Sequence, residues 1–336
     1  MTDLTTAKQV KTYCTKIGSD PLLVQGAGGN ISWKDGEMLW IKASGTWLAH
    51  AEKQEIFIPV NLAHLRLKIA EENFSVAPKV LGDSSLKPSI ETILHALMPH
   101  KIVVHLHAIE ILAHLVRKTP LQDFKKLIGD AVKWVFVDYF KPGAELAQAV
   151  SMQLAKHHGA DVVFLKNHGL VIGGDDIKGI EFSLSKLLSL LQNNIHHLQV
   201  KTQPPEFMID GYVPSKDKEV NKLATVDELT TKLETDWALY PDHVVFLGEK
   251  ATIIKSSLSS YDLYNISITK PPFVFVVGKG VYESTTINDA QRIQLRCYYE
   301  VLTRQVVSEN LESLTSFQVA ELLNWEAEKY RISVSS

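Results

Sequence analysis

The sequence predicts an α/β protein in which strands and helices alternate along the chain. Short apolar runs rich in β-branched residues, such as residues 102–107 and 162–165, are typical of buried strands. Segments with apolar side chains at helical spacing lie between these runs, for example at residues 144–158. This alternation favours a layered architecture. The chain of 336 residues is long enough for one large domain or for two smaller ones.

The first part of the chain contains a glycine-rich turn at residues 26–35, in which the residues after Gly29 are expected to form a strand and a turn. Pro88 suits the start of a helix, because proline is favoured in the first helical turn. Strands are expected at residues 38–43 and 102–107, and helices at residues 6–17, 60–72, 89–97 and 108–116.

The middle of the chain predicts a hairpin, with strands at residues 162–165 and 170–172 on either side of Asn167-His168-Gly169. A strand at residues 135–137 and a helix at residues 144–158 precede it. Asp175 or Asp176 would cap the next helix, whose apolar stripe continues to Leu198. That helix is expected to end near residues 202–205, at a probable domain boundary.

The remaining residues predict helices and strands with weaker patterns. Asn288, with Gln291 three residues later, predicts a capped helix start. Helices are expected at residues 227–236, 288–308 and 316–330, and strands at residues 244–247 and 273–277.

The composition excludes several classes of function. The net charge of −3 and the pI near 6.5 give no electrostatic reason to expect a nucleic acid or an anionic membrane as partner. The apolar runs are too short to span a bilayer, and residues 1–11 lack the pattern of a signal peptide. Two distant cysteines imply no disulfide framework. We therefore expect a soluble, cytoplasmic protein.

Three histidines predict a metal site. His105 and His107 lie two residues apart in a predicted strand, so their side chains point to the same face. His168, from the predicted hairpin, would complete a catalytic site of three histidines with an open position for water or substrate. A single histidine in a strand is more often a core residue whose ring nitrogens are hydrogen bonded. The paired spacing, an upstream carboxylate and a His-Gly turn together favour metal binding instead.

Glu91 is the upstream carboxylate. An acidic residue in the first turn of a helix is favoured by the helix dipole, and a glutamate beside a metal also serves as a general acid or base. His95 follows four residues later on the same helix face and is interpreted as a packing or hydrogen-bonding residue. The other histidines are interpreted as structural or surface residues: His50, His64, His100, His114, His157, His158, His196, His197 and His243.

The glycine-rich turn does not predict a dinucleotide site. A Rossmann fingerprint requires a helix after its glycines, whereas the residues after Gly29 favour a strand. A tight glycine turn can still present backbone N–H groups to an anion. Ser44-Gly45 lies at the end of a predicted strand. It is interpreted either as a weak binding site for an oxyanion or phosphate or as a simple turn.

Five motifs, in this order, resemble the class II aldolase/adducin family. They are Gly28-Gly29-Asn30-Ile31-Ser32, Lys42-Ala43-Ser44-Gly45, Pro88-Ser89-Ile90-Glu91, His105-Leu106-His107 and Lys166-Asn167-His168-Gly169-Leu170. The resemblance implies a three-layer α/β/α domain with a largely antiparallel central sheet, followed by a C-terminal α/β extension. It also implies a homo-oligomer, often a tetramer.

The resemblance also implies roles for single residues. His105, His107 and His168 would hold a divalent metal, most often zinc, and Glu91 would be the catalytic acid or base. The residues that would bind the substrate are Gly28, Gly29, Asn30, Ser44, Gly45 and Ser89. Residues 206–336 resemble the region that follows the aldolase domain in longer members, including those fused to a short-chain dehydrogenase and acting on rhamnulose phosphate. The expected division is therefore 1–205 and 206–336.

The implied function is a zinc-dependent retro-aldol cleavage of a ketose or a ketose phosphate. The alternatives are a sugar-phosphate epimerase or dehydratase, or a non-enzymatic adducin-like module. Ile90 stands where the family often has a second serine, so any phosphate is expected to be held less tightly or with help from Lys42 or Lys87. A substrate without phosphate is the competing expectation. A family tyrosine has no clear counterpart between Thr119 and Gly129, and Tyr139 is a nearby candidate.

Overall fold

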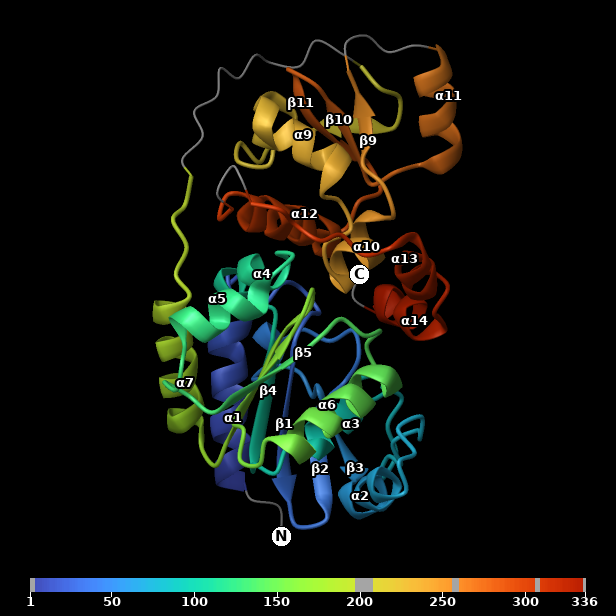
Figure 1. Cartoon of the computed structure of the whole chain (residues 1–336). Coiled ribbons are helices and arrows are strands. Elements are labelled where there is room, and N and C mark those ends of the chain that lie inside the picture. The colour runs from blue at the N-terminus through green and yellow to red at the C-terminus, as the bar shows by residue number, and fades with distance from the viewer. Residues whose placement is uncertain (1–3, 197–207, 256–259, 306–308, 335–336) are drawn as a thin grey trace. The chain divides into compact units, whose positions relative to one another are not determined.

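The computed structural model describes residues 4–196, 208–255, 260–305 and 309–334 (Figure 1). The chain divides into two compact units. The first contains residues 1–192 together with residues 325–335, and the second contains residues 193–324. The predicted boundary at residues 202–205 lies outside the described residues, as does Leu198.

A seven-stranded sheet forms the centre of the first unit, in the order β3-β2-β1-β4-β7-β6-β5. Neighbouring strands are antiparallel except for β5 and β6, which are parallel. The predicted largely antiparallel sheet is thus confirmed. The strands are β1 (Asn30–Asp35), β2 (Met38–Lys42), β3 (Phe57–Asn61), β4 (Ile102–Leu106), β5 (Trp134–Val137), β6 (Val162–Leu165) and β7 (Gly169–Gly174).

Helices cover both faces of this sheet, which gives the predicted three layers (Figure 1). One face packs against α1 (Leu4–Gly18), α4 (Ile109–Leu115), α5 (Pro120–Leu127) and α7 (Ile177–Leu190). The other face packs against α2 (Leu62–Ala70), α3 (Thr92–Leu97) and α6 (Ala144–Lys156). A short 3-10 helix, η1 (Leu48–His50), and the C-terminal α14 (Glu326–Val334) complete the unit.

The alternation of side chains along β4 decides which layer each residue enters. Ile102, Val104 and Leu106 pack in the core on the α1 side of the sheet, and Val103 packs on the α3 side. His105 therefore points to the α3 side, as Val103 does. This places it on the face where α3 begins.

Three predicted helices of the first unit have different bounds in the structure. The helix expected at residues 89–97 begins only at Thr92, because Pro88 bridges Ala43 and the Ser89 N–H donates to Lys42 O, which hold this segment extended. The helix expected at residues 60–72 begins at Leu62, since Val60 still belongs to β3. The helix after Asp176 ends at Leu190, before Ile195.

The second unit contains a four-stranded sheet in the order β8-β11-β10-β9, which is consistent with a C-terminal α/β extension. Its strands are β8 (Tyr212–Pro214), β9 (Thr252–Ile254), β10 (Phe273–Val276) and β11 (Gly280–Ser284). Its helices are α8 (Lys222–Thr225), α9 (Asp227–Thr235), α10 (Pro241–Leu247), α11 (Ser260–Thr269), α12 (Asp289–Leu302) and α13 (Ser316–Leu323). The predicted capping box of Asn288 and Gln291 is confirmed at the start of α12.

Two predictions in this part of the chain were wrong. Residues 244–247 form the second half of α10 instead of a strand. Every residue of α10 is buried, and a run of four apolar residues such as 244–247 has the same sequence pattern in a buried helix as in a buried strand. The single helix expected at residues 316–330 is two helices, since α13 ends at Leu323 and α14 begins at Glu326.

No helix in the described ranges combines the length and the apolar character that a membrane span requires.

Candidate metal centre

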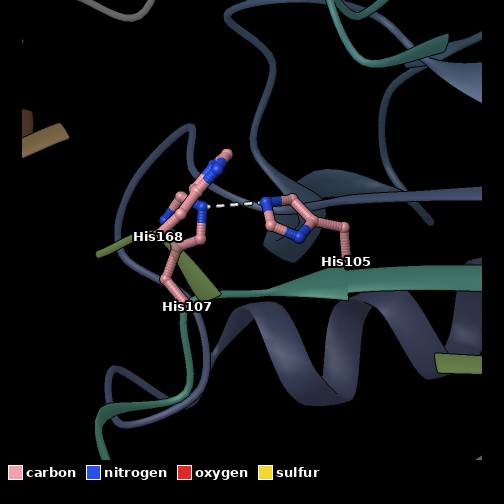
Figure 2. Close-up of side chains that lie close together, drawn as sticks. All are labelled: His105, His107 and His168. Carbon is pink, nitrogen blue, oxygen red and sulfur yellow. Dashed lines mark hydrogen bonds between the residues drawn. The ribbon is translucent and has the colours of Figure 1, made fainter. Parts of the chain in front are cut away.

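Two of the three histidines come from the central strand of the sheet. His105 lies on β4, between β1 and β7, and His107 follows directly after the strand ends. Both imidazoles are buried, and their Nε2 atoms are hydrogen bonded at 3.0 Å (Figure 2). The predicted strand spacing therefore does bring the two rings together.

The third histidine is placed by the turn between β6 and β7. Asn167 has a positive φ of 52°, which asparagine tolerates better than most residues, and the His168 N–H donates to Leu165 O at 3.1 Å. Gly169 allows β7 to approach β4, because a β-carbon there would lie 2.3 Å from Leu106 O. The strand register then sets His168 against the end of β4.

The three imidazoles converge on one point (Figure 2). The centroid of the His105 ring lies 4.9 Å from those of His107 and His168, and the latter two are 5.3 Å apart. One nitrogen from each ring lies within 4.8 Å of the other two. Within the ranges that the structure describes, these are the residues whose His, Cys, Asp or Glu ligand atoms cluster closely enough to hold a metal ion.

The donor set fits a divalent transition metal. The Nδ1 atom of His105 donates to Leu170 O at 3.0 Å, which leaves the Nε2 atom of that ring with its lone pair facing the cluster. A backbone carbonyl that fixes the tautomer of a ligating histidine is a common feature of metal sites. Imidazole nitrogens suit zinc and its neighbours in the periodic table better than they suit magnesium or calcium.

Glu91 lies beside the histidine cluster. It occupies the N-cap position of α3, with Oε2 3.5 Å from His105 Nε2 and Oε1 3.4 Å from His168 Nε2. Burial alone would raise the pKa of this carboxyl. The electrostatic interactions with His105 and His168 and a hydrogen bond from Asn30 outweigh burial, and the pKa is lowered to about 2. Glu91 is therefore a carboxylate at neutral pH.

Asn30 holds that carboxylate in place. Its Nδ2 group donates to Glu91 Oε2 at 2.8 Å and to Ser89 Oγ at 3.3 Å. The Ser89 hydroxyl also accepts the Glu91 N–H at 3.2 Å. Asn30 is opposite His105 in the pairing of β1 with β4, so the strand register places the amide beside the histidine cluster.

His95 is a hydrogen-bonding residue, as the sequence indicated, and its partners show what it does. Its Nδ1 atom lies 2.8 Å from Ser32 Oγ, and its Nε2 atom contacts Asn30 Oδ1. Burial lowers the pKa of His95 to about 3, so the ring is neutral. Because an amide oxygen only accepts, the proton lies on Nε2, and His95 fixes which way the Asn30 amide faces.

The sequence interpretation did not identify this relay from Ser32 to Glu91. A signal for it was present, because Ser32 lies two residues after Asn30 on a strand and His95 lies four residues after Glu91. Each pair shares a face. The link between the two pairs depends on the packing of α3 against β1, which no local pattern shows.

The glycine turn is shaped by the sheet. The Gly28 N–H donates to Gln25 O at 2.9 Å. Gly29 has a φ of 62°, and a β-carbon there would lie 2.8 Å from His105 O. Gly29 therefore allows β1 to start close to β4, because a side chain there would collide with the backbone of His105.

Ser44 and Gly45 lie next to the segment of Ser89. The Ser44 N–H donates to Lys87 O at 2.9 Å, and Gly45 has a φ of 79°. Lys42, which is buried, donates from Nζ to Ala27 O at 3.0 Å and to Thr46 O at 2.7 Å. The two segments that were expected to bind the substrate thus run side by side toward Glu91.

Comparison with known proteins agrees with this geometry. The family model described as "Class II Aldolase and Adducin N-terminal domain" matches residues 9–180. The chain belongs to the class II aldolase and adducin family. The match ends within α7, so it covers the sheet, the histidine cluster and Glu91, and it leaves the second unit outside.

Individual relatives match the same part of the chain. An L-fuculose phosphate aldolase of Methanococcus maripaludis is 30% identical over 171 residues, which are 47% of this chain and 79% of that protein. YuxG of Bacillus subtilis, an uncharacterized oxidoreductase, is 31% identical over 192 residues, but the match spans only 27% of its length and 52% of this chain. The N-terminal class II aldolase domain of a conserved Thermoplasma acidophilum protein is 28% identical, with a TM-score of 0.47 over 55% of this chain and 91% of that domain.

Proposed function

We propose that this protein is a metal-dependent lyase of the retro-aldol type that cleaves a ketose or a ketose phosphate. The observation that supports this most directly is the convergence of three buried imidazoles on one point, with the Glu91 carboxylate beside two of them. Three imidazoles leave a ligand position open, and a fixed carboxylate beside that position is where a proton must move.

His105, His107 and His168 would hold the metal, with zinc as the preferred ion. A divalent cation there supplies Lewis acidity toward the carbonyl and the neighbouring hydroxyl oxygen of a bound ketose. The chain itself supplies two other things. The hydrogen bond from His105 to Leu170 fixes the direction of one ligand, and burial excludes bulk water from the imidazoles.

Glu91 would carry the proton at the reacting carbon. In the cleavage direction, the hydroxyl on the leaving fragment gives its proton to a base, its carbon becomes the carbonyl carbon of an aldehyde, and the C–C bond breaks. The electron pair of that bond stays on the other fragment as an enediolate. A proton must then reach the enediolate carbon. Because Glu91 is ionised, it can accept that proton in the reverse step, before condensation.

The remaining residues would orient these groups. Asn30 and Ser89 hold the carboxylate, and His95 sets the direction of the Asn30 amide. Gly29 allows the start of β1 to lie close to His105, and Gly28 precedes it in the same turn. Ser44, Gly45 and Ser89 lie on adjoining segments and would bind the far end of the substrate, where a backbone turn can face an anion.

The first experiment is metal analysis combined with a substrate screen. Protein purified without chelators should contain stoichiometric zinc or a related metal, and chelation should lower the melting temperature, because a ligand that binds only the folded state stabilises it. His107→Ala should lose the metal, whereas His157→Ala, a change at an exposed histidine, should keep it. Absence of metal from the unmodified protein would count against the proposal.

The metal-loaded protein is then tested against ketoses and ketose phosphates, with detection of the released aldehyde. Product analysis separates the alternatives, since an epimerase returns an isomer and a dehydratase releases water. If the metal-loaded protein converts none of these compounds, the result would favour a non-enzymatic, adducin-like module. We further propose a homo-oligomer, as the family resemblance implies, and light scattering that reports a monomer would contradict it.

A further inference from the structure

The C-terminal helix α14 packs on the first unit, on the two segments expected to hold the far end of the substrate. At its start, Lys141 Nζ lies 4.8 Å from the centroid of the Trp325 ring. The same ring approaches Gly143, where an added β-carbon would lie 3.3 Å from the Trp325 ring edge and 4.0 Å from Ile90 O. The chain therefore re-enters the first unit beside Ile90, next to Glu91.

The middle of the helix covers Lys87. Its Nζ atom lies 4.4 Å from the centroid of the Tyr330 ring, which is the geometry of a cation–π contact. Lys87 directly precedes Pro88-Ser89, and its carbonyl accepts the Ser44 N–H. Tyr330 thus engages the basic side chain that was expected to assist a substrate phosphate.

The end of the helix covers Gly45. A β-carbon on Gly45 would lie 2.8 Å from Val334 Cβ and 3.2 Å from Arg331 O. Arg331 is in the last turn of α14, where the carbonyl groups carry the negative end of the helix dipole. An anion beside Gly45 would face that partial negative charge as well as the Val334 side chain.

We propose that α14 and a substrate phosphate compete for the same groups, Gly45 and Lys87. This inference rests on the proposed function. With α14 in place, the site takes an unphosphorylated ketose, because Val334 and Arg331 O cover the glycine turn and Tyr330 covers the lysine. A phosphorylated ketose binds only when α14 moves away. The free energy needed to release the helix therefore weakens the binding of the phosphorylated ketose. α14 therefore determines the class of substrate.

The test weakens the contact of α14 without changing the metal site. Tyr330→Ala removes the ring from Lys87, and Tyr330→Phe keeps it. Ser333→Ala, on an exposed position of the same helix, is the control for a substitution in α14 as such. Val334→Ala is a second weakening variant, in case the first does not fold. Metal content is measured for each protein.

The readout is kcat/KM for matched phosphorylated and unphosphorylated ketoses. We expect Tyr330→Ala to raise the value for the phosphorylated ketose by about tenfold or more, and to leave the unphosphorylated one unchanged. Tyr330→Phe and Ser333→Ala should behave like the unmodified protein. An equal effect on both substrates, no effect, or a loss for the phosphorylated substrate would overturn the proposal.

Inorganic phosphate gives a readout that does not depend on turnover. In the unmodified, metal-loaded protein, phosphate should increase hydrogen exchange in the backbone amides of α14. The phosphate concentration that gives half of the maximal increase should be lower in Tyr330→Ala than in the unmodified protein. Phosphate bound only at the metal would leave the exchange of α14 unchanged and would overturn the proposal. If no ketose is cleaved by any of the proteins, the proposed function fails, while this measurement still decides whether phosphate displaces α14.

Discussion

At the scale of single residues, the metal centre depends on a carboxylate that remains ionised although it is buried. Its charge is stabilised by the histidines on one side and by the Asn30 amide on the other. Metal binding and proton transfer are different tasks, and in the proposed mechanism Glu91 performs the second. A change that keeps its shape and removes its charge can separate them.

Glu91→Gln should keep the fold and the metal and lose turnover. The expected loss in kcat is about 10²–10⁴-fold, the usual contribution of a positioned acid or base. Steady-state kinetics and metal analysis on the same preparation measure both. Glu145→Gln is the control, because Glu145 is exposed on α6. Turnover near that of the unmodified protein would remove Glu91 from the mechanism.

His95 is linked to Glu91 through Asn30. His95→Phe would keep the bulk of the ring and leave Ser32 Oγ and Asn30 Oδ1 without this partner. We expect a destabilisation of about 1–3 kcal/mol for the buried polar groups. We also expect a fall in kcat, because Asn30 can then turn away from Glu91. Urea unfolding and kinetics check the two effects, and a variant that is destabilised with an unchanged kcat would limit His95 to a structural role.

At the scale of elements, the sheet register assembles the centre. β1 brings Asn30 opposite His105, β4 carries the histidine pair, and the turn after β6 brings His168 to the end of β4. The closest of these approaches occurs at Gly169, where the backbone of β7 meets Leu106 O. Space at that point is therefore a condition for bringing the three histidines together.

Gly169→Ala should push the hairpin away from β4. The added β-carbon would lie 2.3 Å from Leu106 O and 3.1 Å from His107 Cδ2, so the backbone must shift. We expect a loss of about 1–3 kcal/mol in stability and weaker metal binding. Gly179→Ala is the control, since its nearest neighbour would be Asp176 Oδ1 at an ordinary 3.5 Å. Zinc titration and thermal unfolding measure the difference, and equal metal affinity in both variants would contradict this reasoning.

The same scale shows what the sequence could and could not predict. The strand pair, the hairpin and the capping box were predictable, because each depends on residues that are close in sequence. The start of α3 was placed too early, since the extended form of Pro88 and Ser89 is set by Ala43 and Lys42, far away in the chain. α10 was interpreted as a strand because complete burial removes the periodicity that separates the two structures.

At the scale of the whole molecule, the chain leaves the first unit after residue 192 and returns to it at residue 325. The second unit is thus an insertion in the chain path between α7 and α14. The family resemblance implied a C-terminal extension over residues 206–336, and nothing in the pattern of residues 325–334 shows that they pack on Gly45 and Lys87. That contact joins residues almost three hundred positions apart, as in Gly45 and Val334, and only the folded chain reveals it.

The second unit has its own buried histidine, which makes its stability depend on pH. His243 on α10 is fully buried among the rings of Trp237, Tyr240 and Tyr298, and burial lowers its pKa to about 3. The ring is therefore neutral in the folded unit, whereas the unfolded chain takes up a proton below its ordinary pKa of about 6.5. Stability from this residue is complete above pH 6.5 and falls as the pH drops toward 3, by up to about 1.4 kcal/mol per pH unit.

His243→Phe should remove that dependence, because phenylalanine fills a similar space among the aromatic rings and does not titrate. The measurement is hydrogen exchange of backbone amides in α10 and α12 between pH 4 and pH 7, corrected for the intrinsic effect of pH on exchange. Exchange in α1 and β4 of the same samples serves as the control, since these elements belong to the first unit and should respond equally in both proteins. The protection of α10 should decrease with acid more steeply in the unmodified protein than in the variant. Parallel curves would mean that the folded unit accommodates a protonated His243, and that its burial among three aromatic rings does not set the acid stability of the unit.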